Sequence, residues 1–160
     1  ERLQYVGDTR IQGLISIYNS GDTRLLKNAI QQINNSRISE GLTYSRYPSS
    51  DMQLIPPFSL WWVGMVHDYW MYDPDEEFVK KMLPGVRSVL SFFESYQAKN
   101  GSVENLPWWN FMDWTKEWGW GIPVTGSNDR TASIDILLYQ AFLWAADMEN
   151  KIGNRGMAKE

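Results

Sequence analysis

Apolar residues recur at the spacing of one helix face in four stretches of the chain. In each stretch they occupy positions i, i+3, i+4 and i+7, which lie on the same side of an α-helix. The four sets are Ile11, Leu14, Ile15 and Tyr18; Leu26, Ala29, Ile30 and Ile33; Val86, Val89, Leu90 and Phe93; and Ile134, Leu137, Leu138 and Ala141. A fifth stretch, residues 58–72, is apolar nearly all round, as a helix packed on both sides would be. The pattern therefore predicts five helices, with Pro84-Gly85 kinking or interrupting the fourth.

Acidic residues mark the expected starts of the helices. Asp8 and Asp22 each follow Gly and precede Thr-Arg, and Asp75 precedes two glutamates. Their side-chain oxygens can cap free N–H groups, and their charge suits the helix dipole. The passage from aromatic residues through a tight turn to an acid occurs at residues 18–22 and 72–75, with a weaker copy at residues 144–153. Repeated helix–turn–helix units of this kind predict a toroid or a solenoid.

Two long loops separate the expected hairpins. Residues 37–57 contain Arg46 and two tyrosines, and residues 100–127 contain five tryptophans beside Glu104, Asp113 and Glu117. Residues 103–105 are expected to form a short strand. Long structured loops in a helical protein are more often functional than idle.

Composition excludes several classes of function. The 160 residues correspond to one domain or part of a larger one, and the net charge is −4 without any block of Lys and Arg. Nucleic acid and anionic membrane are therefore not expected as partners. The longest apolar stretch, residues 60–66, is too short to span a bilayer. With no Cys and one His, neither a metal site nor a cofactor is predicted.

Few residues suit nucleophilic or nucleotide chemistry. His67 lies within an expected helix without a nucleophile-elbow sequence, so we interpret it as packed between hairpins. Residues 119–121 (Gly-Trp-Gly) lack the third glycine and the preceding strand of a dinucleotide loop.

Carboxylates among tryptophans remain, and this combination suits sugars. The apolar face of a pyranose stacks on indole, while its hydroxyls bind Asp and Glu. Hydrolysis of a glycosidic bond requires one protonated and one ionised carboxyl group, and an apolar wall raises the pKa of the acid. The alternative for the tryptophan cluster is a core plug for the loop.

Three segments carry a family resemblance. Glu1-Arg2-Leu3-Gln4-Tyr5-Val6-Gly7-Asp8 resembles the second half of the Asp-Cys-Pro-x-x-(Asp/Tyr)-Glu-Arg-Leu-x-(Trp/Tyr)-x-Gly-Asp signature of bacterial α-L-rhamnosidases, glycoside hydrolase family 78. Residues 111–114 (Phe-Met-Asp-Trp) resemble that family's Gly-Asp-Trp loop, with Met in place of Gly. Residues 55–62 and 69–75 resemble the helix and turn between these motifs.

The resemblance implies an all-α fold, part of an (α/α)6 toroid of the six-hairpin glycosidase type. Five helices and the start of a sixth make about half of such a barrel, with long Trp-rich loops. Residues 1–160 are then expected to be the N-terminal part of a single, incomplete (α/α)6 catalytic domain. Half a barrel would expose an apolar seam where further hairpins pack.

The resemblance also implies the activity, which is inverting hydrolysis of terminal α-L-rhamnosides. Glu1 would be the general acid, and Asp8 would help to hold the sugar and tune that acid. Asp113 would bind hydroxyls, and Trp114 would stack on the rhamnose ring with its neighbours. These neighbours are Trp109 and Trp118.

The expected partners are rhamnose-containing glycans or glycosides and the rest of a parent chain. The general base would come from beyond residue 160, so that the fragment alone is expected to be inactive. The resemblance is to bacterial enzymes and is compatible with a periplasmic or secreted protein.

Three alternatives stay open at this point. The first is a six-hairpin glycosidase acting on another sugar, because fold resemblance alone does not identify a substrate. The second is a non-catalytic carbohydrate-binding helical module. The third is a helical-repeat protein that binds a protein partner on its concave face.

Overall fold

Five α-helices form the framework of the computed structural model, which describes residues 3–159. They are α1 (Val6–Ser20), α2 (Arg24–Asn35), α3 (Pro56–Tyr72), α4 (Glu76–Glu94) and α5 (Ala132–Ile152). Three short 3-10 helices follow α4, namely η1 (Gly119–Gly121), η2 (Ser127–Asp129) and η3 (Met157–Lys159). Residues 3–159 contain no β-strand, so the all-α prediction is confirmed. The strand expected at residues 103–105 is wrong, because only a single bridge joins Gln97 and Val103.

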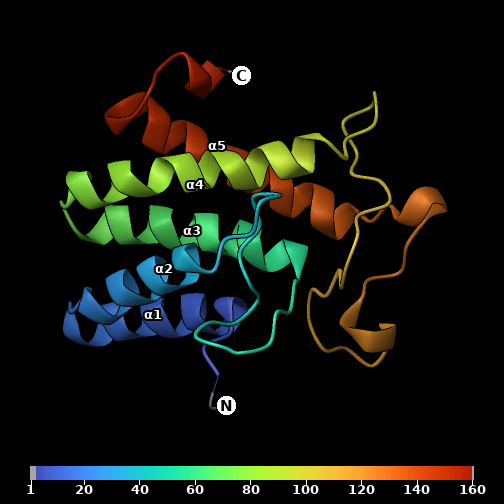
Figure 1. Cartoon of the computed structure of the whole chain (residues 1–160), viewed down its shortest axis with the longest axis horizontal. Coiled ribbons are helices and arrows are strands. Elements are labelled where there is room, and N and C mark those ends of the chain that lie inside the picture. Colours follow the sequence, from blue (N-terminus) through green and yellow to red (C-terminus); the bar gives the residue numbers. More distant parts are fainter. Residues whose placement is uncertain (1–2, 160) are drawn as a thin grey trace.

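The helices pack as a zigzag of two layers (Figure 1). Helix α3 lies between α1 and α5, and these three helices form one layer. Helix α2 packs against α1 and α3, while α4 packs against α3 and α5. Successive helices that alternate in this way between two layers make up a section of an (α/α) toroid. The predicted fold class is therefore confirmed.

Helix α3 is the centre of the core. Its apolar pattern predicted packing on both sides, and eleven of its residues are buried. Pro56 and Pro57 occupy the first turn, where the missing N–H groups have no helical partner to lose. Trp62 is fully buried, and its indole N–H donates to the carbonyl oxygen of Ile30 at 3.1 Å, which fixes α3 against α2.

Two of the three expected acidic starts hold backbone N–H groups. Asp75 is the N-cap of α4 and accepts from the N–H of Phe78 at 3.1 Å, and Asp22 accepts from the N–H of Arg24 at 3.0 Å. Asp8 differs, because α1 begins at Val6 and places Asp8 in its first turn, past the cap position. Helix α4 runs without interruption through Pro84, so the interruption that the sequence allowed at Pro84-Gly85 does not occur.

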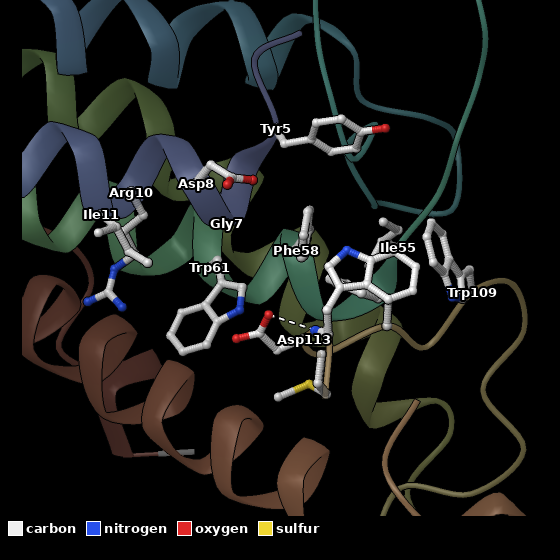
Figure 2. A pocket seen from close by; sticks show the side chains of 13 residues that line it. Tyr5, Gly7, Asp8, Arg10, Ile11, Ile55, Phe58, Trp61, Trp109 and Asp113 are labelled. Atoms are coloured by element: carbon white, nitrogen blue, oxygen red, sulfur yellow. Dashed lines mark hydrogen bonds between the residues drawn. The ribbon is translucent and has the colours of Figure 1, made fainter. Parts of the chain in front are cut away.

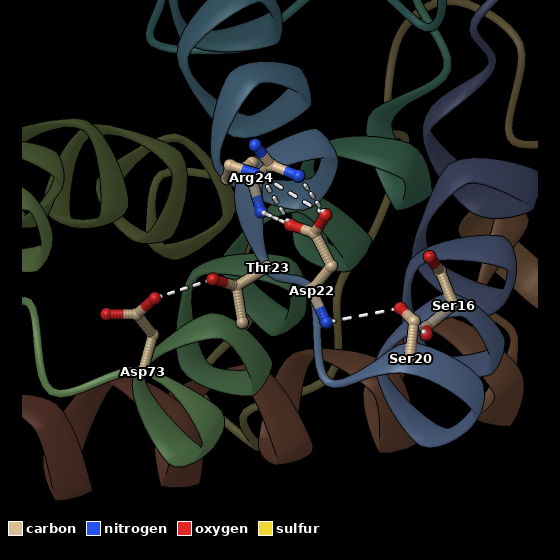
Figure 3. A network of polar contacts seen from close by, with 6 residues as sticks. All are labelled: Ser16, Ser20, Asp22, Thr23, Arg24 and Asp73. Atoms are coloured by element: carbon tan, nitrogen blue, oxygen red, sulfur yellow. Dashed lines mark hydrogen bonds and ion pairs between the residues drawn. The ribbon is translucent and has the colours of Figure 1, made fainter.

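The two hairpin turns are tied together by polar contacts (Figure 3). The hydroxyl of Thr23 donates to the carboxylate of Asp73 at 2.6 Å. Lys27, in the first turn of α2, pairs with Asp75 at 2.5 Å. These contacts join the turn after α1 to the turn after α3. Helices α1 and α3 also pack against each other, and the candidate site lies at their opposite, N-terminal ends.

Two apolar stripes remain exposed at the edges of the framework. On α1, Ile11, Ile15 and Tyr18 are exposed, although the sequence pattern placed them on a buried face. On α5, an exposed stripe is formed by Ile136, Tyr139 and Leu143. No helix within residues 3–159 has the length and apolar character that crossing a membrane requires.

Candidate functional site

A pocket of about 520 Å³ lies where the N-terminal ends of α1 and α3 meet the long loop between α4 and α5 (Figure 2). Its walls come from three segments: the start of α1, the start of α3 and residues 109–114. The lining residues are Tyr5, Gly7, Asp8, Arg10, Ile11, Ile55, Phe58, Trp61, Trp109, Phe111, Met112, Asp113 and Trp114. Aromatic rings and carboxylates thus share one cavity of the size of a small-molecule site.

Two carboxylates enter the pocket from different elements. Asp8 projects from the first turn of α1, and Asp113 projects from the loop (Figure 2). Asp113 is oriented by the N–H of Trp114, which donates to it at 2.7 Å. Within residues 3–159 neither carboxylate forms an ion pair. Both are therefore available to accept hydrogen bonds from a polar ligand.

One wall of the pocket is a cluster of aromatic rings. The ring centroids of Phe111 and Trp109 are 5.0 Å apart, and those of Phe111 and Trp114 are also 5.0 Å apart. Phe58 of α3 meets Phe111 edge to face at 5.8 Å, which joins the wall to the helical core. Trp114 is 66% exposed, so its indole has a face available for stacking.

The wall is held by contacts within its own loop. The N–H of Met112 donates to the carbonyl oxygen of Gly121 at 2.9 Å, so the two arms of the loop run together. Gly121 has a φ of 70°, and a Cβ at this position would lie 2.3 Å from the ring of Phe111. Only glycine satisfies both conditions, because other residues rarely adopt this conformation and would overlap the ring.

The base of the loop is anchored to α5. Asp135, in the first turn of α5, accepts from the N–H of Val103 at 2.8 Å and from the hydroxyl of Ser102 at 2.9 Å. Further along, Glu104 accepts from Asn128 at 3.1 Å and pairs with Arg130 at 3.5 Å. Glu104, which the sequence marked beside the tryptophans, therefore ties the loop together at a distance from the pocket lining.

Tyr5 is fixed by the loop between α2 and α3. Arg46 donates to its hydroxyl at 2.6 Å and lies over its ring, with the guanidinium carbon 5.4 Å from the centroid. The N–H of Val6 donates to the carbonyl oxygen of Ser45 at 2.9 Å. This loop thus supports the start of α1, and Arg46 holds Tyr5, which lines the pocket.

Comparison with known proteins gives the family. Residues 1–160 match the model of the bacterial alpha-L-rhamnosidase 6 hairpin glycosidase domain. The chain belongs to this family. The resemblance that the motifs at residues 1–8 and 111–114 carry is therefore confirmed. None of the curated proteins matches the chain.

Two solved structures share the fold of this rhamnosidase-family chain. A GH78 family rhamnosidase of Bacillus sp. GL1 is 21% identical and superposes with a TM-score of 0.83 over 99% of this chain and 16% of that one. A rhamnosidase from Klebsiella oxytoca with rhamnose bound is 17% identical, with a TM-score of 0.80 over 99% of this chain and 30% of that one. The chain therefore spans less than a third of the length of either structure.

Of the five predicted rhamnosidase-site residues that the structure describes, four line the pocket and one does not. The four are Asp8, Asp113, Trp109 and Trp114. Trp118 is half-buried at the start of η1 and does not line the pocket. Glu1 lies outside the described residues.

Arg10 and Trp61 are among the lining residues that were not predicted as site residues. Gly7, Arg10 and Ile11 follow the i, i+3, i+4 spacing of one helix face, so a helical projection through the motif would have found Arg10. Trp61 was hidden in a stretch that is apolar on all sides.

His67 lies away from the pocket, between α3 and α5. Its ring centroid is 6.0 Å from that of Trp70 and 6.3 Å from that of Trp144, and its Nε2 is 3.4 Å from the carboxylate of Asp147. This is the packed position that the sequence suggested. Within the described part of the chain, no group of three His, Cys, Asp or Glu side chains could hold a metal ion.

Proposed function

We propose that this chain is part of the catalytic domain of an α-L-rhamnosidase and that its pocket binds the terminal sugar of a rhamnose-containing glycan or glycoside. One observation supports the proposal above the others: the carboxylates of Asp8 and Asp113 share a cavity with two indoles, those of Trp109 and Trp114. The chain that carries this cavity matches the rhamnosidase domain over residues 1–160. Indole can stack on the apolar side of the ring and its C5 methyl, while the carboxylates accept from hydroxyls.

In this proposal the reaction is an inverting hydrolysis by two carboxyl groups. Glu1, the glutamate of the motif, protonates the glycosidic oxygen, and a second carboxylate activates water on the opposite face of the sugar. Asp8 holds the sugar and tunes Glu1. Its position in the first turn of α1 suits a carboxylate, because the positive end of the helix dipole lies there.

The proposal places the general base beyond residue 160. Residues 1–160 would then be the N-terminal part of a single (α/α)6 catalytic domain, and further hairpins would cover the exposed stripes of α1 and α5. The chain on its own would not hydrolyse rhamnosides.

The experiment is an assay of the full protein that carries this chain, with aryl α-L-rhamnoside and aryl α-D-glucoside as substrates. The expected result is cleavage of the rhamnoside, with NMR detecting the β-anomer of rhamnose as the first product. Preference for the glucoside would favour a six-hairpin glycosidase for another sugar, and binding without turnover would favour a carbohydrate-binding module.

Glu1→Gln tests the acid. It is expected to lower kcat by about 100-fold or more and to leave rhamnose binding nearly unchanged, because the amide keeps the size of the side chain but donates no acidic proton. Glu94→Gln is the matched control, since Glu94 is an exposed residue at the end of α4. A Glu1→Gln enzyme with ordinary turnover would remove this residue from its role.

A further inference from the structure

The guanidinium group of Arg10 lies against two indoles beside the pocket. Its central carbon lies 5.1 Å from the ring centroid of Trp61 and 4.6 Å from that of Trp144. The two indoles are themselves 6.3 Å apart, at an interplanar angle of 47°. Arg10 and Trp61 both line the pocket, whereas Trp144 does not. The cation therefore joins a pocket wall to a helix behind it.

Helix α3 provides a slot of the right size for this group. Gly64 lies one turn after Trp61, and a Cβ on it would approach Trp144 to 2.8 Å and the Nε of Arg10 to 2.9 Å. Real Cβ atoms essentially never make contacts this short, so the guanidinium and the indole fill space that is open only because position 64 has no Cβ. Three of the five helices meet here, because Arg10 belongs to α1, Gly64 to α3 and Trp144 to α5.

Asp68, one turn beyond Gly64, fixes the orientation of the guanidinium. The Nε of Arg10 donates to one carboxylate oxygen at 2.8 Å, and an Nη donates to the other at 3.3 Å. The side chains of Arg10 and Asp68 are 19% and 13% exposed, so water competes little for these bonds. A planar, two-point contact of this kind holds an arginine in one plane, which lysine would not do.

From this geometry we infer that Arg10 is a positioning residue, which holds the indole of Trp61 flat in the wall of the pocket so that the sugar meets a rigid surface. The inference rests on the proposed function, since it assigns a role within the same site. The charge of Arg10 is already paired with Asp68, so its effect on a neutral sugar passes through Trp61. A rigid wall raises affinity by removing the entropy cost of ordering it on binding.

A double-mutant cycle tests this inference in the full protein. Arg10→Met is expected to raise KM roughly 3- to 30-fold, the range of a desolvated cation–aromatic contact, while kcat changes little, because stacking acts equally on substrate and transition state. In a Trp61→Ala background, the same Arg10 substitution should leave KM unchanged, because the residue through which it acts is gone. Additive effects on KM would overturn the inference.

A conservative variant separates orientation from charge. Arg10→Lys keeps a cation beside Asp68 but lacks the planar group that lies against both indoles, so it should raise KM nearly as far as Arg10→Met. Full rescue by lysine would overturn the inference. This variant keeps the ion pair between α1 and α3, so it also serves in the cycle with Trp61→Ala if Arg10→Met fails to fold.

Arg87 provides a matched control for the loss of a paired arginine. It makes two hydrogen bonds to Glu149, at 2.6 Å and 2.9 Å, and does not line the pocket. Arg87→Met should lower Tm and leave KM unchanged; an equal rise in KM would show that any loss of stability has this effect, and would overturn the inference. If the unaltered protein binds no rhamnose, the proposed function itself fails, and that result is distinct from an additive cycle.

Discussion

The indole N–H of Trp109 donates a hydrogen bond to the backbone carbonyl oxygen of Trp120, eleven residues further along the same loop, at 3.0 Å. Trp109 also lines the pocket, and its indole N–H fastens the loop that carries Asp113 and Trp114. Trp120 itself is 79% exposed and has a φ of 56°, an uncommon conformation for a residue other than glycine. What the loop requires of Trp120 is its carbonyl group.

Trp109→Phe tests this relationship. Phenylalanine keeps an aromatic face toward the pocket but has no N–H, so the hydrogen bond is lost. We expect the free energy of unfolding to fall by about 1 kcal/mol, because one hydrogen bond is lost. The KM for rhamnoside should rise several-fold, because the loosened loop of the variant must become ordered when the sugar binds. Thermal unfolding and steady-state kinetics measure the two effects. Trp120→Phe is the control, and it should change neither, since the carbonyl group remains; an equal effect of both substitutions would contradict this account.

Asp8 and Asp75 offer a contrast between a site residue and a capping residue. Asp8 lies past the cap of α1 and lines the pocket, so Asp8→Asn should lower turnover by about 100-fold and leave Tm nearly unchanged. Asp75 caps α4 at the far end of the hairpin and pairs with Lys27, so Asp75→Asn should lower Tm and leave kinetics unchanged. Both variants need the same two measurements. Asp8→Asn with lowered Tm and normal turnover would make Asp8 a structural residue.

The helices could be predicted because their apolar faces are satisfied within the chain. Leu26, Ala29, Ile30 and Ile33 repeat at helical spacing, and all four are buried. On α1 the same reasoning failed in part, since Ile11 belongs to the predicted apolar face and is exposed. Periodicity identifies an apolar face but does not say which neighbour covers it.

The site was predictable where a motif fixes the chemistry and unpredictable where tertiary packing does. The motif containing Asp8 and the loop containing Asp113 each suggested sugar binding, and these two residues meet in one pocket. The enclosure of Arg10 depends on Gly64, 54 positions later in the sequence numbering, and on a tryptophan from α5. No local pattern links these three positions, because their proximity arises only when α1, α3 and α5 pack.

Stability should decrease in acid through Glu149. Burial alone would raise the pKa of this carboxyl group, but the hydrogen bonds from Arg87 and from the N–H of Asn154 outweigh it and hold the pKa below its ordinary value of 4.5. The folded protein therefore binds the proton less readily than the unfolded chain. The stabilisation is present above about pH 4.5 and is lost as the pH falls through the lowered pKa of the folded state.

Chemical unfolding between pH 7 and pH 2.5 checks this expectation. Glu149→Gln should lower the free energy of unfolding at pH 7 by about 2 kcal/mol, as expected for loss of charged hydrogen bonds, and should flatten its decline in acid. Asp22 and Asp75 also have lowered pKa values, each held down chiefly by a side-chain hydrogen bond, from Arg24 and Lys27 respectively, so some decline should remain. An unchanged slope in Glu149→Gln would show that this pair does not set the acid response.

Gly64→Ala and Gly119→Ala differ in what the added methyl group meets. At Gly64 the new carbon would lie 2.8 Å from the ring of Trp144 and 2.9 Å from the Nε of Arg10, both held by further contacts, whereas at Gly119 nothing lies within 4 Å. We expect Gly64→Ala to lower stability by roughly 1–3 kcal/mol, as overpacking does, and Gly119→Ala to be nearly neutral.

The pocket gives the Gly64 substitution a second, separable readout. Because the displaced guanidinium no longer lies against Trp61, the KM for rhamnoside should rise in Gly64→Ala. That rise should disappear when Trp61→Ala is introduced as well, since the wall that moved has been removed. Trp144→Phe would relieve part of the overlap by removing the outer ring, and should restore both Tm and KM toward their original values. A Gly64→Ala protein with lowered Tm but unchanged KM would mean that the slot stabilises the fold without shaping the pocket.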